Sequence, residues 1–246
     1  MKQWSTYVRD NQKLLKMIFY LAWPAVVEQA LQTIVQYIDT AMVGRIDANA
    51  SAAVGLSVTM TWVVNSALIA IGIGVLSCIA EAIGAGKMDR ARAFGIQALY
   101  FVVIMGVGMG ILMVGISPLY FGIICTPMLF RASSTILGAV MRGAGDAKSP
   151  MIANLFMNLT NVILNFFLIY ESRTIFLGEF SFYLPSAGLG VMGAAIATAI
   201  SYVVGGIFMV IVYYRNPMLS PRSQKLSFQK NLAGKCLHIG IPIALE

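Results

Sequence analysis

The sequence predicts an all-α membrane protein built as a bundle of six membrane-crossing helices, and three observations lead to this fold class. Six long apolar stretches alternate with short polar loops. The chain is 59% hydrophobic and 11% charged, with a mean hydropathy of +0.80, whereas soluble domains carry about 25% charged residues. Most Lys and Arg residues lie on alternate loops, as in chains that cross a bilayer repeatedly.

Each apolar stretch is long enough for one crossing, because a hydrocarbon core of about 30 Å takes roughly 20 helical residues. A seventh apolar segment begins at residue 237 and runs to the last residue. Spans three and four are joined only by Gly-Ile-Ser-Pro at 115–118, which either a tight turn or a deletion explains. In chain order, the six predicted spans are 14–44, 51–83, 93–117, 119–141, 150–170 and 189–214.

The basic residues predict the orientation of the chain. The loops on one side hold only Arg45 and Arg173, so the other side, with the N-terminus and the loop after span six, is expected to be cytoplasmic in a multi-pass plasma-membrane protein. The basic residues are scattered without aromatic interleaving, so we expect no nucleic-acid partner despite the net charge of +7. The basic loop residues are Lys2, Arg9, Lys13, Lys16, Lys87, Arg90, Arg92, Arg142, Lys148, Arg215, Arg222, Lys225, Lys230 and Lys235.

Cofactor chemistry has little support in the sequence. Cys78, Cys125 and Cys236 lie in or beside spans and indicate neither disulfides nor a metal site. The single His238 is interpreted as an interfacial or packing residue rather than a ligand. We expect no cleavable signal peptide, because span one is too long for one and no A-x-A site follows it.

The two ends of the chain share a short pattern. A P-x-x-x-E segment enters an apolar run at residues 24–28 and again at 242–246, as at the start of a second copy of a six-span unit. Internal repeats of this kind build many transporters. We therefore predict a six-helix lobe at 1–214, a cytoplasmic linker at 215–236 and the start of a truncated second lobe at 237–246.

Span one carries polar residues that lipid should reject. Glu28, Gln32, Gln36 and Asp39 fall within about 80° of one another on a helix. A carboxylate at the bilayer centre costs roughly 2.5–3.5 kcal/mol, so it persists where it faces a cavity or a partner. Asp39 is interpreted as an H⁺ or cation site or else as a buried packing carboxylate, and the same two interpretations stay open for Glu28.

Span five carries a second polar stripe. Asn154, Asn158, Asn161 and Asn165 lie within about 60° of one helix face. They line a cavity or ion pathway, or they form interhelical hydrogen bonds, and both roles are compatible. In span six, Thr198 offers a hydroxyl, although a lone Thr in a helix most often bonds its own backbone.

Two groups of charged residues lack an assigned function. Arg131 lies midway in span four, where it could pair with Asp39 or Glu28, or the span could be shifted. The glycine-rich segment 142–148 is predicted to be an ion-paired hinge between spans four and five.

Several motifs together resemble the N-terminal lobe of multidrug and toxic compound extrusion (MATE) transporters, in order along nearly the whole chain. These motifs are YIDTAMVG at 37–44, EAIGAG at 81–86, MRGAGDAKSP at 141–150, NVILN at 161–165 and GVMGAAIAT at 190–198. The resemblance implies a twelve-helix, two-lobe antiporter that expels small cationic or amphipathic compounds and is driven by H⁺ or Na⁺.

The resemblance also implies a coupling site. Asp39 fills the position of the family's acidic residue in the first helix, and Asn161 and Thr198 match its Asn and Thr in helices five and six. Asn165 stands where the family has an Asp, so a titratable group is absent. A Na⁺ bound at Asp39 is the one metal ion that we expect, with no cofactor. Glu28, Gln32, Gln36, Asn154 and Asn158 are expected to line the cavity.

Three alternatives differ from this prediction. A flippase for lipid-linked sugars shares the architecture but tends to place several basic residues in its cavity, where this chain offers only Arg131. A membrane-embedded enzyme would need clustered His, Asp or Glu, or a Ser–His pair, and the sequence argues against it. The third alternative is an inactive fragment that merely inserts into the lipid bilayer, because the C-terminal lobe is missing from this chain.

Overall fold

The computed structural model describes residues 12–44, 48–114, 127–177, 180–221, 224 and 226–245. The connection at 115–118, Cys125, Arg45 and the final Glu246 of the second P-x-x-x-E segment lie outside the described residues. The described elements are α2 (Gln12–Gly44), α3 (Ala48–Gly84), α4 (Met88–Val114), α6 (Met128–Gly143), α7 (Lys148–Leu168), β1 (Glu171–Leu177), β2 (Phe180–Ala187), α8 (Gly190–Arg215) and α9 (Lys230–Leu245).

The predicted helical membrane bundle is confirmed. In the described part of the chain, five helices are long and apolar enough to cross a membrane, namely α2, α3, α4, α7 and α8. The fourth predicted span corresponds to α6, of which 16 residues are described. Apolar side chains such as Ile104 on α4 and Ile211 on α8 are exposed on the outside of the bundle, as expected where lipid replaces water.

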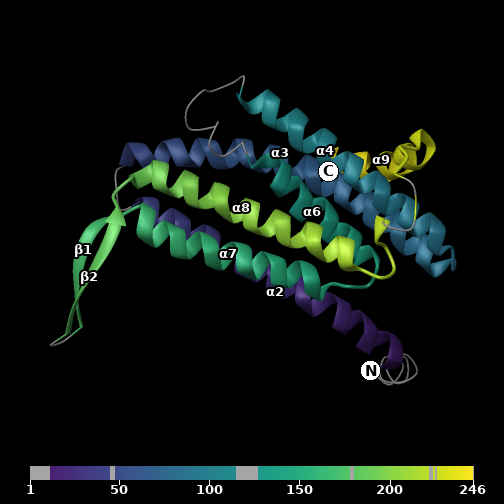
Figure 1. Cartoon of the computed structure of the whole chain (residues 1–246), viewed down its shortest axis with the longest axis horizontal. Helices are drawn as coiled ribbons and strands as arrows, with labels where there is room; N and C mark the ends of the chain where they lie inside the picture. Colours follow the sequence, from purple (N-terminus) through teal and green to yellow (C-terminus); the bar gives the residue numbers. More distant parts are fainter. Residues whose placement is uncertain are drawn as a thin grey trace, which may run out of the picture.

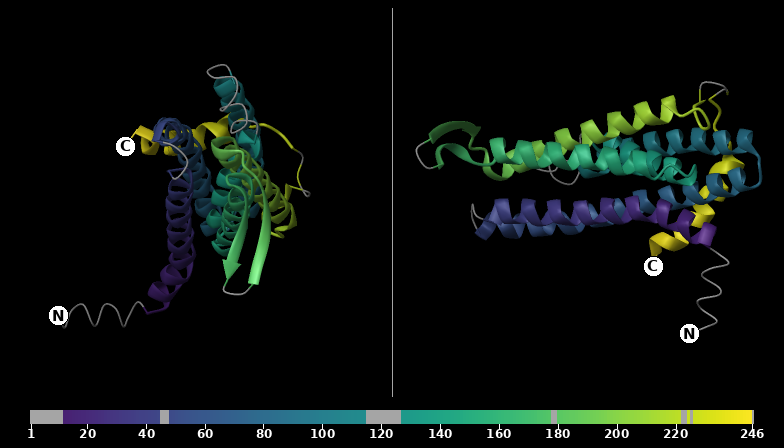
Figure 2. Two further views of the ribbon diagram at one scale, coloured as in Figure 1. Left: turned by 90° about the vertical axis from the view of Figure 1, so that its left-hand side faces the viewer. Right: turned by 90° about the horizontal axis from the view of Figure 1, so that it is seen from below.

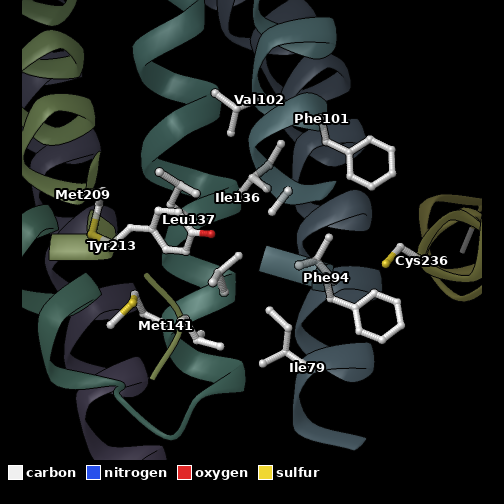
Figure 3. Packing of buried hydrophobic residues seen from close by; sticks show 14 of the residues in the cluster. Ile79, Phe94, Phe101, Val102, Ile136, Leu137, Met141, Met209, Tyr213 and Cys236 are labelled. Atoms are coloured by element: carbon white, nitrogen blue, oxygen red, sulfur yellow. The ribbon is translucent and has the colours of Figure 1, made fainter. Parts of the chain in front are cut away.

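The core lies around α6, which packs against α3, α4 and α8 (Figures 1 and 3). Ile136, Leu137 and Val140 on α6 are fully buried, and Met209 and Tyr213 of α8 close the same cluster. Small residues allow the close approach between these helices. A Cβ on Gly206 of α8 would lie 2.5 Å from a backbone oxygen of α6. Lipid gives helices no hydrophobic reason to associate, so such close contacts contribute much of the packing energy.

A β-hairpin between α7 and α8 was not predicted. Strands β1 and β2 pair antiparallel, with an irregularity between Glu171 and Arg173, and project beyond one end of the helices (Figure 1). Gly188 and Gly190 after the hairpin have φ values of +63° and +54°, a conformation that glycine adopts without steric cost. We call this end of the bundle the hairpin end. The opposite end, where α6 ends and α7 begins, is called the basic end, because Arg142 and Lys148 belong to these helix termini.

The C-terminal helix folds back onto α3 at the basic end (Figure 2). The helix begins at Lys230, before the predicted boundary at 237. Lys235 Nζ lies 2.7 Å from a carboxylate oxygen of Glu81, and the helix backbones approach closely at Gly74 and Gly240. The free thiols of Cys78 and Cys236 are buried.

Candidate cation-binding site

Helices α2 and α7 run parallel, and polar contacts join them. Two hydrogen bonds between the helices, at Asp39 and at Glu28, link residues separated by the same 126 positions. Only 6% of the residues in the apolar window of α2 are buried, so one face of this helix holds it to the bundle. The polar stripes predicted on spans one and five therefore meet at this interface.

Asp39 lies at the centre of the predicted coupling residues. Asn165 Nδ2 donates to Asp39 Oδ1 over 2.6 Å and also to Asn161 Oδ1 over 3.1 Å. In the opposite orientation of the Asn161 amide, which replaces the hydrogen bond from Asn165, the Asn161 nitrogen donates over 2.9 and 3.2 Å to the two carboxylate oxygens of Asp39. This orientation is electrostatically favoured, because a carboxylate only accepts hydrogen bonds.

Thr198 brings α8 into the same cluster. Its hydroxyl lies 3.3 Å from the Asn161 amide and donates to the backbone oxygen of Ala194 over 2.9 Å. The four residues that the sequence predicted, Asp39, Asn161, Asn165 and Thr198, thus form one connected group. Their role in binding a cation remains a prediction.

The cluster offers oxygen ligands and a negative charge. Asn161 and Asn165 are buried, and Asn165 Oδ1 has no hydrogen-bond donor. None of the ion pairs found among the described residues involves Asp39. Among the described residues, no three His, Cys, Asp or Glu side chains lie close enough together to hold a metal ion. One carboxylate with amide and hydroxyl oxygens is a donor set for a proton or a hard monovalent cation, since such ions are held by oxygen in transporters.

Glu28 has a different environment nearer the basic end. Arg142 Nη1 lies 3.3 and 3.2 Å from its two carboxylate oxygens, and Asn154 Nδ2 donates to Oε1 over 2.6 Å. The Glu28 side chain is only 12% exposed. The pairing explains how a second carboxylate is accommodated on span one, because a buried charge needs a partner.

Arg142 was missed as a partner of Glu28. The sequence indicated an ion-paired hinge within 142–148, but Arg142 pairs with Glu28 on α2, while Asp146 accepts hydrogen bonds from the backbone and side chain of Ser149. The signal that could have revealed it is Glu28 itself, because a carboxylate buried on a membrane helix needs a positive partner from another element.

The remaining predicted cavity residues are less closely connected. Asn158 is buried on α7, and its Nδ2 has no partner. Gln32 is half-buried and Gln36 is exposed. The structure brings Asn154 to Glu28 but gives Gln36 no comparable contact among the described residues.

Arg131 pairs with neither Asp39 nor Glu28. Its Nη2 donates to Asn65 Oδ1 on α3 over 3.0 Å, and its guanidinium lies 4.4 Å from the centre of the Tyr202 ring on α8. The aromatic face and the amide partly replace hydration for this cation.

Comparisons with known proteins agree with the fold. The MatE family model matches residues 24–124. A probable multidrug resistance protein NorM of Thermotoga maritima is 30% identical over 95% of this chain and 52% of its own length. The uncharacterized transporter YisQ of Bacillus subtilis is 26% identical over 93% of this chain and 52% of its own length.

Solved structures show the same fold. An outward-facing MATE family transporter matches with a TM-score of 0.80 and 24% identity, over 94% of this chain and 52% of the other. An inward-facing MATE transporter matches with a TM-score of 0.71 and 23% identity, over 90% and 53%.

The bundle and its matches define a polytopic membrane protein of the MATE transporter fold. The chain is similar to the N-terminal half of MATE family proteins, with residues 24–124 matching the MatE family model. It spans about half the length of the curated relatives that it matches.

Proposed function

We propose that this chain is the N-terminal lobe of a secondary antiporter that exports small cationic or amphipathic organic compounds in exchange for H⁺ or Na⁺. The observation that carries the proposal is the contact of Asp39 with the amides of α7. A carboxylate without an ion-pair partner among the described residues lies inside a membrane helix, where a cation is its natural counter-charge. The relative from Thermotoga maritima is named as a multidrug resistance protein, which supports the substrate class.

The coupling follows from the packing of α2. Because α2 attaches to the bundle mainly through α7, the charge state of Asp39 changes the interface that positions the whole helix. An arriving cation competes with Asn165 for the carboxylate. If two packings of α2 differ by a few kcal/mol, occupancy by a cation shifts their populations.

The remaining structure of the transporter is also a proposal. Residues 1–214 form the first lobe, 215–236 the linker and 237–246 the start of a second lobe, which completes the central cleft. The positive-inside rule places the basic end in the cytoplasm of a cell whose plasma membrane holds the protein.

Replacement of Asp39 by Asn tests the proposal in the complete transporter that contains this lobe. Drug efflux should fall to the level of cells without the transporter, while membrane expression stays unchanged. Asp89→Asn is the matched control, because Asp89 is 88% exposed beside Arg92 at the basic end. Liposomes with a pH gradient alone or a Na⁺ gradient alone identify the coupling ion. Undiminished transport by the Asp39 variant rejects the proposal.

A further inference from the structure

The interface of α2 and α7 holds two carboxylates in equivalent positions. Asp39 contacts Asn165 toward the hairpin end, and Glu28 contacts Asn154 toward the basic end. Eleven residues separate the two members on each helix, which is three helical turns or roughly 16 Å. The same register therefore continues along α2 and α7 from one carboxylate to the other.

Polar residues also occupy the middle of this interface. Asn158 lies between Asn154 and Asn165 on α7, and the shared register places Gln32 of α2 opposite it. Asn158 is 7% exposed and its Nδ2 has no hydrogen-bond partner, which is unusual for a buried amide. We call these residues the polar seam: Glu28, Gln32, Asp39, Asn154, Asn158 and Asn165.

A guanidinium group closes the seam at the basic end. Arg142 Nη1 lies within 3.3 Å of both oxygens of Glu28, and 28% of the Arg142 side chain is exposed. While this pair is intact, the positive charge repels a cation that approaches Glu28 along the seam. When a cation binds Glu28, Arg142 loses its partner and can turn toward the headgroup region, as long basic side chains do.

From this arrangement we infer that Glu28 is a second, inner acceptor for the coupling cation and that Arg142 is its electrostatic gate. The cation leaves Asp39, passes Asn158, binds Glu28 in place of Arg142 and is released at the basic end. The inference rests on the proposed antiport function and adds the route of ion release. The ligand class is a small monovalent cation, either H⁺ or Na⁺, because carboxylates and amide oxygens accept both.

The gate also separates coupling from leakage. With no cation present, Arg142 returns to Glu28 and the seam carries a closed ion pair at its inner end. The next cation therefore stays bound at Asp39 until it displaces Arg142 from Glu28. Asn154 holds Glu28 from the α7 side, so the carboxylate stays in place while Arg142 leaves.

The test compares Glu28→Gln with Asp39→Asn in the complete transporter reconstituted into liposomes. One arm measures the equilibrium binding of labelled Na⁺ and, separately, the transport that a Na⁺ gradient drives. The other applies a pH gradient and follows the infrared carboxylic-acid band. For Glu28→Gln we expect cation binding within about twofold of wild type and coupled transport lower by on the order of tenfold, or about 1.4 kcal/mol in the barrier. The Asp39→Asn variant should lose both cation binding and coupled transport.

The matched control is Glu81→Gln. Glu81 also pairs with a basic residue, Lys235, at the basic end, but it lies outside the polar seam. This variant should transport as wild type. A wild-type rate for Glu28→Gln, alongside an inactive Asp39→Asn, overturns the inference and leaves the antiport proposal intact. An active Asp39→Asn instead contradicts the antiport proposal itself.

A charge swap tests whether the pair of Glu28 and Arg142 serves ion release or only attaches α2 to the bundle. The double variant Glu28→Arg with Arg142→Glu restores an ion pair but moves the carboxylate off α2. We expect it to fold and to stay inactive, so restored transport overturns the inference. If the swapped protein does not fold, Glu28→Asp and Glu28→Asn decide, since they have the same length and only Asp accepts a cation. Asp should then support transport and Asn should not, and equal activities overturn the inference.

Discussion

Asn165 on α7 donates a hydrogen bond of 2.6 Å to Asp39 on α2, and this contact joins the helix that is least buried to the rest of the bundle. Asn165 also stands where the MATE resemblance leads us to expect a second acid. By donating a hydrogen bond, the Asn165 amide therefore partly stabilises the Asp39 carboxylate without adding another charge.

Replacement of Asn165 by Asp should make the cluster bind cations more strongly. Two carboxylates at this distance repel each other unless a proton or a cation lies between them. We expect the affinity for the coupling cation to rise by about tenfold, or 1.4 kcal/mol. Thermal unfolding in detergent, measured across Na⁺ concentration and pH, should show stabilisation by the cation that exceeds that of wild type. Equal dependence in both proteins contradicts the prediction.

Removing the hydroxyl of Thr198 should weaken cation binding more than removing a comparable hydroxyl on α7. Thr198 and Thr160 each donate to the backbone oxygen four residues earlier, but only Thr198 contacts Asn161. Thr198→Val should weaken cation binding by about 1 kcal/mol, the value of one hydrogen bond. Thr160→Val, on an exposed face, should leave binding unchanged. Equilibrium cation binding measures both, and equal losses would show that the effect comes from the helix and not from the cluster.

The crossing of α6 and α8 should not tolerate a side chain at Gly206. An added Cβ would lie 2.5 Å from the backbone oxygen of Phe130 and 2.7 Å from its Cα, so the helices would have to separate. We expect Gly206→Ala to destabilise the protein by about 2 kcal/mol. Gly108→Ala has open space around its Cβ and should be neutral or stabilising by up to about 1 kcal/mol, because Ala favours a helix. The melting temperature in detergent compares the two, and a stable Gly206→Ala protein would refute this packing.

The docking of α9 on α3 should control access to Cys236. The thiol is buried, and a Cβ on Gly74 of α3 would collide with the backbone oxygen of Cys236. Gly74→Val should therefore displace α9 and raise the rate of maleimide labelling of Cys236 by at least about tenfold, since labelling follows the population of open states. Gly84→Val, where the Cβ meets nothing within 4 Å, is the control. Both proteins should carry Ser at Cys78 and Cys125, and equal labelling rates would contradict the docking.

Much of the site could be predicted from the spacing of residues along single helices. The helical period fixes which side chains share a face, so Asn154, Asn158, Asn161 and Asn165 were expected on one side of span five and Asp39 on one side of span one. The motif resemblance then added Thr198. The structure confirms that four of the predicted residues meet, while the cation itself remains a prediction.

The partners of the basic residues could not be predicted in this way. Arg142 pairs with a residue 114 positions away, and Arg131 with one 66 positions away, so each contact depends on how whole helices pack. A pattern within one span contains no information on which distant side chain arrives opposite it. The hairpin of β1 and β2 was missed for a related reason, because a strand is stabilised by a partner segment and the residue pattern of one segment does not identify that partner.

The amino-acid sequence alone specifies a bundle of membrane helices, because its apolar stretches are long enough to cross lipid as helices, in which the backbone groups are hydrogen-bonded internally. It also specifies which faces of spans one and five are polar. The cationic partner of Glu28, and the lack of one for Asp39 among the described residues, depend on how the helices pack. The physical reason is that a charge inside a membrane is defined by its neighbours, and packing of distant helices supplies them.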